Sequence, residues 1–310
     1  MEDLVFAAGI VASGIRLSTP VIFAALGECI VERSGVLNLG IEGMMIMGAF
    51  TGFIGTLFTG NIFIGLLIAI SAPIMMAILM AFLSVNLRTN QLVAGLAIWL
   101  LGSGVTALVY RLVFGIMTTS PKINEISPID IPILSHIPVI SSVIFSYDPM
   151  VYLAFLLVPL VHIFLFKTNI GLKIRTVGEN PRQADASGVS VYKIRYLTLI
   201  IGGALAGLGG SYFALVTTGT FLENITAGQG WIALAMVIFG RWKPFYVVIG
   251  ALIFGMVDSV QIGLQSLGTP VPTQFLLMLP YILPIIIMSG MYNRSYAPAA
   301  LAVAYRREER

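Results

Sequence analysis

Long apolar runs separated by short polar stretches dominate this chain. A helix needs about 20 largely apolar residues to cross roughly 30 Å of hydrocarbon. Nine runs approach that length, and they cover residues 4–27, 36–58, 62–83, 91–113, 148–166, 195–217, 230–240, 244–265 and 273–290. The seventh run is short, which favours a half-crossing or part of a broken helix. The pattern therefore predicts an all-α, multi-pass membrane protein with about nine transmembrane helices.

The composition excludes several classes of protein. Of the 310 residues, 58% are hydrophobic and 10% are charged, and the mean hydropathy is +0.97. Soluble domains carry about 25% charged residues, so this chain cannot cover a water-facing surface. The net charge of +3 comes without a dense run of either sign, which excludes a nucleic-acid-binding chain. One cysteine and two distant histidines predict neither a disulfide nor a metal site, so we expect no cofactor in this chain.

The basic residues mark one side of the predicted membrane protein. Of the 17 Lys and Arg residues, 14 lie in the polar stretches 28–35, 84–90, 167–194 and 241–243, at the adjoining Arg195, or in the tail 291–310. Basic residues favour cytoplasmic loops. We therefore expect residues 1–310 to form one transmembrane domain with its N terminus outside and its C terminus in the cytoplasm. Residues 114–147, rich in Pro, Ser and Ile, are then an ordered extracytoplasmic loop.

The inner stretch 167–194 contains signals for a short helix over residues 181–187. The signals are an N-cap at Asn180, a first helical residue at Pro181, a capping-box residue at Gln183 and a left-handed terminus at Gly188. Ala184 and Ala186 are expected to be exposed between polar neighbours. Local features leave two interpretations open, a knob that docks into a partner protein and a helix that only connects two spans.

Ionisable residues within apolar runs are functional hypotheses, because burying them unpaired costs several kcal/mol. Glu42 can bond the backbone of a broken helix or face a solute pathway, and the structural role is favoured. Asp258 has Gln261 on the same helical face, and this polar stripe either lines a conduit or bonds across to another helix or to Arg16. At the inner end of the first run, Glu28, Glu32 and Arg33 form either an interfacial ion pair or a solvated helix end, and the second is favoured.

Three stretches resemble one known family, the membrane-spanning permease subunits of ATP-binding-cassette (ABC) importers for simple sugars and nucleosides. Residues 27–49, GECIVERSGVLNLGIEGMMIMGA, are similar to the ERSGVxNxGxEGMMxxGA pattern of the nucleoside-type permeases. Residues 178–189 followed by 202–210 resemble the family's coupling-helix loop and its glycine-rich span. Residues 228–235, GQGWIALA, are similar to the GxGfxaIAva segment. The three stretches occur in family order.

The resemblance implies a transporter half built from related or inverted repeats in a prokaryotic inner membrane. It implies a second permease subunit, identical or different, two cytoplasmic ATPase subunits and an extracytoplasmic solute-binding protein. This chain has no G-x-x-x-x-G-K-[ST] run, so ATP and magnesium are expected to bind the partner subunits, and the chain is not expected to be an enzyme. The expected ATPase-coupling residues are Gly178, Glu179, Asn180, Pro181, Gln183, Ala184 and Gly188.

The same resemblance implies a cargo of nucleosides or related ribose-containing solutes. The expected pathway candidates are Asn38, Glu42, Trp231, Asp258 and Gln261. A simple-sugar permease is the first alternative. An ion-coupled secondary transporter is the second, in which Arg16, Glu42 and Asp258 would be the ion-coupling residues.

Overall fold

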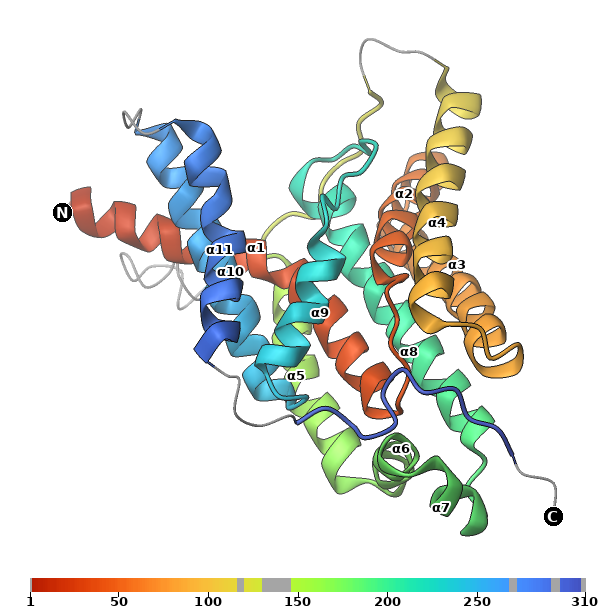
Figure 1. The fold of residues 1–310 in the computed structure, drawn as a ribbon. Helices are drawn as coiled ribbons and strands as arrows, with labels where there is room; N and C mark the ends of the chain where they lie inside the picture. Colours follow the sequence, from red (N-terminus) through yellow and green to blue (C-terminus); the bar gives the residue numbers. More distant parts are fainter. Residues whose placement is uncertain (1, 116–119, 130–145, 268–271, 291–295, 308–310) are drawn as a thin grey trace.

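The computed structural model describes residues 2–115, 120–129, 146–267, 272–290 and 296–307, and these parts of the chain form helices joined by irregular segments (Figure 1). The helices are α1 (Glu2–Arg33), α2 (Ile41–Thr59), α3 (Ile62–Ala81), α4 (Gln91–Phe114), α5 (Pro149–Lys167), α6 (Asn169–Glu179), α7 (Pro181–Ala186), α8 (Val191–Tyr212), α9 (Gln229–Phe239), α10 (Pro244–Ser266) and α11 (Thr273–Gly290). Short π-helices, η1 (Phe82–Asn86) and η3 (Phe213–Thr217), extend α3 and α8. The all-helical prediction is confirmed for the described residues.

Seven of the described helices are long and apolar enough to cross a membrane: α1, α2, α3 with η1, α4, α5, α8 with η3, and α10. The predicted seventh run is the eleven-residue α9, which at 1.5 Å per residue spans about half of the hydrocarbon thickness. The last predicted run, 273–290, forms the 18-residue α11, of which the apolar segment Thr273–Ile282 is described in full. The short seventh run is therefore confirmed, whereas the structure does not establish nine full crossings.

Three helices form the interior, and the others surround them. In α1, α2 and α8, between 61% and 72% of the most apolar stretch is buried, against 28% to 39% in α3, α4, α5 and α10. The glycine-rich α8 packs against α1, α2 and α3. At Gly210 of α8, a side-chain Cβ would overlap the carbonyl oxygen of Met45 in α2. Glycine is needed there because the two backbones touch.

The connection from α1 to α2 differs from the prediction. The sequence pattern placed a polar loop at 28–35 and a helix from residue 36, but α1 continues to Arg33 and α2 begins at Ile41. Between them, residues 34–40 run as irregular backbone whose side chains are mostly buried. Figure 1 shows this segment rising from the end of α1 to the start of α2 between α8 and α4. The surrounding protein buries this non-helical backbone, so residues 34–40 form a broken-helix segment between α1 and α2.

The described part of the predicted outer loop 114–147 is irregular backbone that hydrogen bonds hold against the helices. Ile123 and Ile126 donate backbone hydrogen bonds to the carbonyl oxygens of Gly219 (2.8 Å) and Leu215 (2.9 Å) at the end of η3. Ile129 donates to the carbonyl oxygen of Tyr147 (2.9 Å). These bonds fit the predicted ordered loop for residues 120–129, while residues 116–119 and 130–145 lie outside the described part of the chain.

The packing of α8 on α2 predicts a difference between two glycine substitutions. Gly210→Ala forces the two backbones apart and should destabilise the protein by about 1–3 kcal/mol, the usual effect of overpacking. Gly104→Ala in α4 is the matched control, because no atom lies within 4 Å of its new Cβ and alanine favours helices. Thermal unfolding of the detergent-purified variants measures the effect, and equal stability of the two would contradict the close packing of α8.

Candidate functional site

The helices α6 and α7 form a compact element at the end of the molecule where α1 ends (Figure 1). Thr168 caps α6 by accepting a hydrogen bond from the N–H of Gly171 (3.1 Å). One face of α6 is buried through Gly171, Ile174, Val177 and Gly178, and the opposite face carries polar residues. The burial of this face fixes α6 against the membrane helices and leaves its polar face open.

The predicted short helix is confirmed as α7, and its two ends have the expected geometry. Asn180 Oδ1 accepts the N–H of Gln183 (3.1 Å), and Pro181 is the first helical residue. Gly188 has φ +81°, in the left-handed region. Its N–H donates to the carbonyl of Asp185 (2.9 Å), and the N–H of Val189 donates to the carbonyl of Ala184 (2.9 Å). This pair of bonds is a Schellman motif. The second half of a capping box is not formed, since the Asn180 N–H donates to the carbonyl of Thr176 (2.9 Å).

The expected exposure of Ala184 is wrong, and that of Ala186 is confirmed. Ala184 is 4% exposed and belongs to the hydrophobic core, whereas Ala186 lies on the exposed surface. The reason is geometric, because two residues apart on a helix point to different sides. The outer face of α7 therefore presents Ala186 together with the exposed side chains of Arg182 and Gln183.

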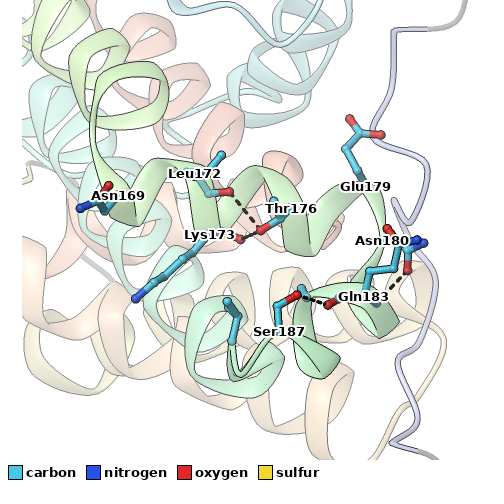
Figure 2. Close-up of a pocket in the computed structure, with 10 residues that line it drawn as sticks. Asn169, Leu172, Lys173, Thr176, Glu179, Asn180, Gln183 and Ser187 are labelled. Atoms are coloured by element: carbon cyan, nitrogen blue, oxygen red, sulfur yellow. Dashed lines mark hydrogen bonds between the residues drawn. The ribbon is translucent and has the colours of Figure 1, made fainter.

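A cavity of about 530 Å³ lies between α6 and α7. Figure 2 shows the side chains that line it from the two helices. Most of them are polar: Asn169, Lys173, Thr176, Glu179, Asn180, Gln183 and Ser187. Two of the hydroxyls are bonded internally, Thr176 to the carbonyl of Lys173 (2.9 Å) and Ser187 to that of Gln183 (2.9 Å). Asn180 Oδ1 and Glu179 Oε2 also accept hydrogen bonds within the chain, from the N–H groups of Gln183 (3.1 Å) and Ala299 (3.4 Å). The side chains of Asn169, Lys173 and Gln183 offer amide and ammonium groups that can bond polar side chains of another protein.

Glu42 is buried within the membrane helices and bonds the start of α9. Its side chain is 1% exposed, and its carboxylate accepts hydrogen bonds from the N–H groups of Gly228 (2.8 Å) and Gly230 (2.6 Å) and from the hydroxyl of Thr226. Glu42 also lies in the first turn of α2. Its negative charge therefore faces the positive N-terminal ends of two helices. In this position the carboxylate caps α9.

The structure also buries the acidic residues near the end of α1, so the expected solvated helix end is wrong. Glu28 is fully buried and accepts the N–H of Asn38 (3.0 Å), and Glu32 accepts the indole N–H of Trp242. Arg33 donates to the carbonyl oxygen of Trp242 (3.0 Å). Trp242 has φ +55°, a conformation unfavourable for a residue with a side chain. The end of α1 thus holds the strained turn between α9 and α10.

The other pathway candidates are dispersed. Asn38 is fully buried in the broken segment, and Gln261 is 3% exposed in α10. Asp258 is half-buried, and within the described residues no ion pair joins it to Arg16, which donates instead to the carbonyl of Ser146 (3.0 Å). Its neighbour Ser259 donates to the carbonyl of Ile10 in α1 (2.7 Å), so this part of α10 bonds across to another helix.

Trp231 is the candidate that lines an open cavity. It is 38% exposed, packs edge-on against Trp99 with ring centres 4.9 Å apart, and borders a cavity of about 370 Å³ together with Gly228 and Tyr281. The structure therefore does not gather the five candidates into one site. It places Trp231 at an aromatic cavity and three others, Asn38, Glu42 and Gln261, inside the packing.

Several residues with defined contacts were not anticipated from the sequence. Trp242 and Arg195 are buried, and both contact segments that are remote in the chain. A tryptophan or an arginine beside an apolar run is equally consistent with a membrane-interface position. Local sequence therefore carried no signal that distinguishes a position in the protein interior from one at the membrane interface.

Comparison with known proteins identifies relatives along the whole chain. Residues 10–288 match the family model described as branched-chain amino acid transport system / permease component. The guanosine ABC transporter permease protein NupQ of Bacillus subtilis is 38% identical, with 97% of each chain covered. The nucleoside ABC transporter permease protein NupC of Lactococcus lactis is 35% identical, with 96% of each covered. The "Putative glucose ABC transporter permease protein TsgC13" of Haloferax volcanii is 37% identical, covering 98% of this chain and 99% of its own.

A solved structure shares the fold. It is described as "An inward-facing conformation of a putative metal-chelate type ABC transporter", and the superposition has a TM-score of 0.54 over 91% of this chain and 85% of that chain. The sequences are 14% identical, so this likeness concerns the arrangement of helices alone.

The cap supplied by Glu42 predicts a loss of stability on neutralisation. Glu42→Gln replaces one acceptor oxygen by an N–H₂ group that cannot accept from Gly228 or Gly230, and it should cost about 1.5–3 kcal/mol, the range for hydrogen bonds to a charged group. Thr226→Val removes only the hydroxyl donor and should cost less. Thermal unfolding of both variants tests whether Glu42→Gln loses more stability than Thr226→Val. An unchanged unfolding midpoint for Glu42→Gln would contradict the capping role.

Proposed function

This chain belongs to the family of branched-chain amino acid transport system permease components, and from its similarity to permeases named for guanosine and nucleosides we propose that it forms the translocation pathway for nucleosides. It is the permease component of an ABC importer for nucleosides or sugars and a multi-pass membrane protein. The observation that carries the nucleoside proposal is the identity of 35–38%, over nearly the full length, to permeases named for guanosine and for nucleosides.

The aromatic cavity at Trp231 supports a cargo with a flat ring. Trp231 and Tyr281 have partly exposed aromatic side chains, and both border a space of about 370 Å³. A nucleobase stacks on such faces, with about 1–3 kcal/mol for each stacked base in proteins that bind single strands. A simple sugar remains the second candidate, because a relative named for glucose is 37% identical.

Uptake by membrane vesicles that hold the complete transporter distinguishes the two cargo classes. We expect unlabelled guanosine and uridine to compete with labelled guanosine, and ribose and glucose at the same concentration to compete weakly. Vesicles from cells without this chain are the control. Efficient uptake of glucose with no uptake of guanosine would overturn the nucleoside proposal and support the sugar permease.

The α6–α7 element is proposed as the contact with a cytoplasmic ATPase subunit. The chain lacks a phosphate-binding motif, so ATP and magnesium are assigned to two partner subunits, and an extracytoplasmic protein is assigned the delivery of cargo. A second permease subunit, identical or different, completes the pathway. The capped α7 supports this proposal because it presents a fixed exposed surface around Ala186 beside a polar cavity. The C terminus then lies in the cytoplasm, as the basic residues also indicate.

Ala186→Trp tests the ATPase contact without disturbing the core. The variant adds bulk only to the exposed face of α7, so membrane insertion should be normal while uptake falls at least about tenfold, equivalent to ~1.4 kcal/mol of lost docking energy. Ala186→Ser is the size control and should transport normally. Ala184 is unsuitable because it is buried. Normal uptake by Ala186→Trp would overturn the assignment.

An ion-coupled transporter is the remaining alternative, and it is tested in the same system. Uptake should require ATP and the ATPase subunits in vesicles clamped at zero ion gradient. Accumulation of cargo driven by an ion gradient, in vesicles that contain this chain and no ATPase subunit, would overturn the ABC mechanism.

A further inference from the structure

The C-terminal segment 296–307 lies across the α6–α7 element and the ends of the membrane helices. Figure 1 shows it passing α6 on the side where α1 ends and continuing toward the start of α8. The N–H of Ala300 donates to the carbonyl of Gly178 in α6 (2.9 Å), and the N–H of Ala302 donates to the carbonyl of Gly35 after α1 (3.2 Å). We call residues 296–307 the tail strap.

Three backbone segments meet where the tail strap crosses. Gly35 has φ +85°, and a Cβ there would lie 2.9 Å from the carbonyl oxygen of Ala300. At Gly178 a Cβ would overlap the carbonyl oxygen of Arg33. Only glycine permits this approach of α1, α6 and the tail strap. Two of the sequence stretches singled out above, 27–49 and 178–189, thus contribute the glycines of a single junction.

Arg195 ties the tail strap to α8. Its side chain is 1% exposed, and its guanidinium donates to the carbonyl of Val303 (3.1 Å). The described residues provide no hydrogen-bond partner for its Nε and Nη2 atoms. A buried charge with so few partners is costly, and removing one partner of such a group is strongly destabilising. The carbonyl of Val303 in the tail strap therefore stabilises the buried guanidinium of Arg195 in α8.

Both ends of the tail strap are attached to the helices. At one end, Arg241 from the α9–α10 turn lies over the ring of Tyr296 at 4.6 Å. At the other end, the buried Tyr305 meets Tyr192 of α8 edge-on at 6.1 Å, and Arg307 pairs with Asp185 of α7 at 3.2 Å. The Arg307 side chain is mostly exposed, so this ion pair contributes little. Tyr305 is the main anchor because its ring is buried.

We propose that the tail strap is a positioning element that joins the α6–α7 element rigidly to α1 and α8, so that motion of an ATPase subunit is transmitted to the membrane helices. The proposal rests on the proposed ATPase contact of α7. A helix of six residues is not stable alone, so its position depends on what it touches. The tail strap contacts α6, α7, α8 and the segment after α1 at once, and this arrangement opposes tilting of α6–α7 relative to the membrane helices.

Two deletions test the proposal. Removing residues 296–310 should leave membrane insertion and co-purification with the ATPase subunits intact. Uptake should fall at least about tenfold (~1.4 kcal/mol), while the ATPase subunits continue to hydrolyse ATP without transport. Amide hydrogen exchange should become faster across residues 169–189 and stay unchanged in α2. Removing only residues 308–310 keeps every contact of the tail strap and should change neither uptake nor exchange.

A milder pair of variants covers the case in which the longer deletion fails to fold. Tyr305→Ala removes the buried anchor, whereas Val303→Ala trims a side chain that is 53% exposed and keeps the carbonyl bonded to Arg195. Tyr305→Ala should accelerate exchange in α7 and reduce uptake, and Val303→Ala should do neither.

Two results would overturn the proposal. The first is normal uptake with unchanged amide exchange in Tyr305→Ala. The second is loss of ATPase co-purification on deletion of residues 296–310, which would make the tail itself the docking surface. Failure of the underlying ATPase contact is distinguishable, because Ala186→Trp would then transport normally while the tail variants still altered exchange in α6 and α7.

Discussion

Backbone N–H groups at helix breaks inside an apolar protein must find acceptors within the chain, and this constraint organises the structure. The Glu42 carboxylate accepts hydrogen bonds from the backbone N–H groups at the start of α9, and Glu28 accepts one from the N–H of Asn38. The side-chain oxygen of Gln91 accepts one from the N–H of Leu37 (2.8 Å). Lipid offers no replacement for these acceptors. The broken segment 34–40 and the half-length α9 therefore depend on a few buried polar side chains. Acidic residues that might have faced a solute are instead part of the framework around it.

The sequence predicted the features that local rules control. Apolar runs located the long helices because backbone bonding within lipid demands whole helices. Asn180, Pro181 and Gly188 located α7 because caps depend on a few adjacent residues. The burial of Ala184 and of Glu32 could not be predicted in this way. Each depends on a partner surface brought by folding, as with Trp242, which is 210 residues from Glu32 in the chain.

The predicted pathway residues also divide into features that local sequence controls and features that depend on contacts formed on folding. Glu42 was expected to favour a structural role, and its hydrogen bonds to Gly228 and Gly230 place it in one. Trp231 lies three residues after Gly228, so the cap on α9 also sets the position of the ring that borders the aromatic cavity. The framework and the proposed cargo contact are thus adjacent parts of one helix start. A change at the buried carboxylate would displace the exposed ring as well.

The distance in sequence between Glu42 and its partners has a consequence for how the protein is made. Gly228 and Gly230 lie 186 and 188 residues after Glu42, so they are synthesised long after α2. Until the start of α9 has been synthesised, the Glu42 carboxylate lacks the donors that bond it in the folded protein. Assembly of the interior is completed from the C-terminal third, and chains interrupted before residue 230 cannot reach the native packing of α2.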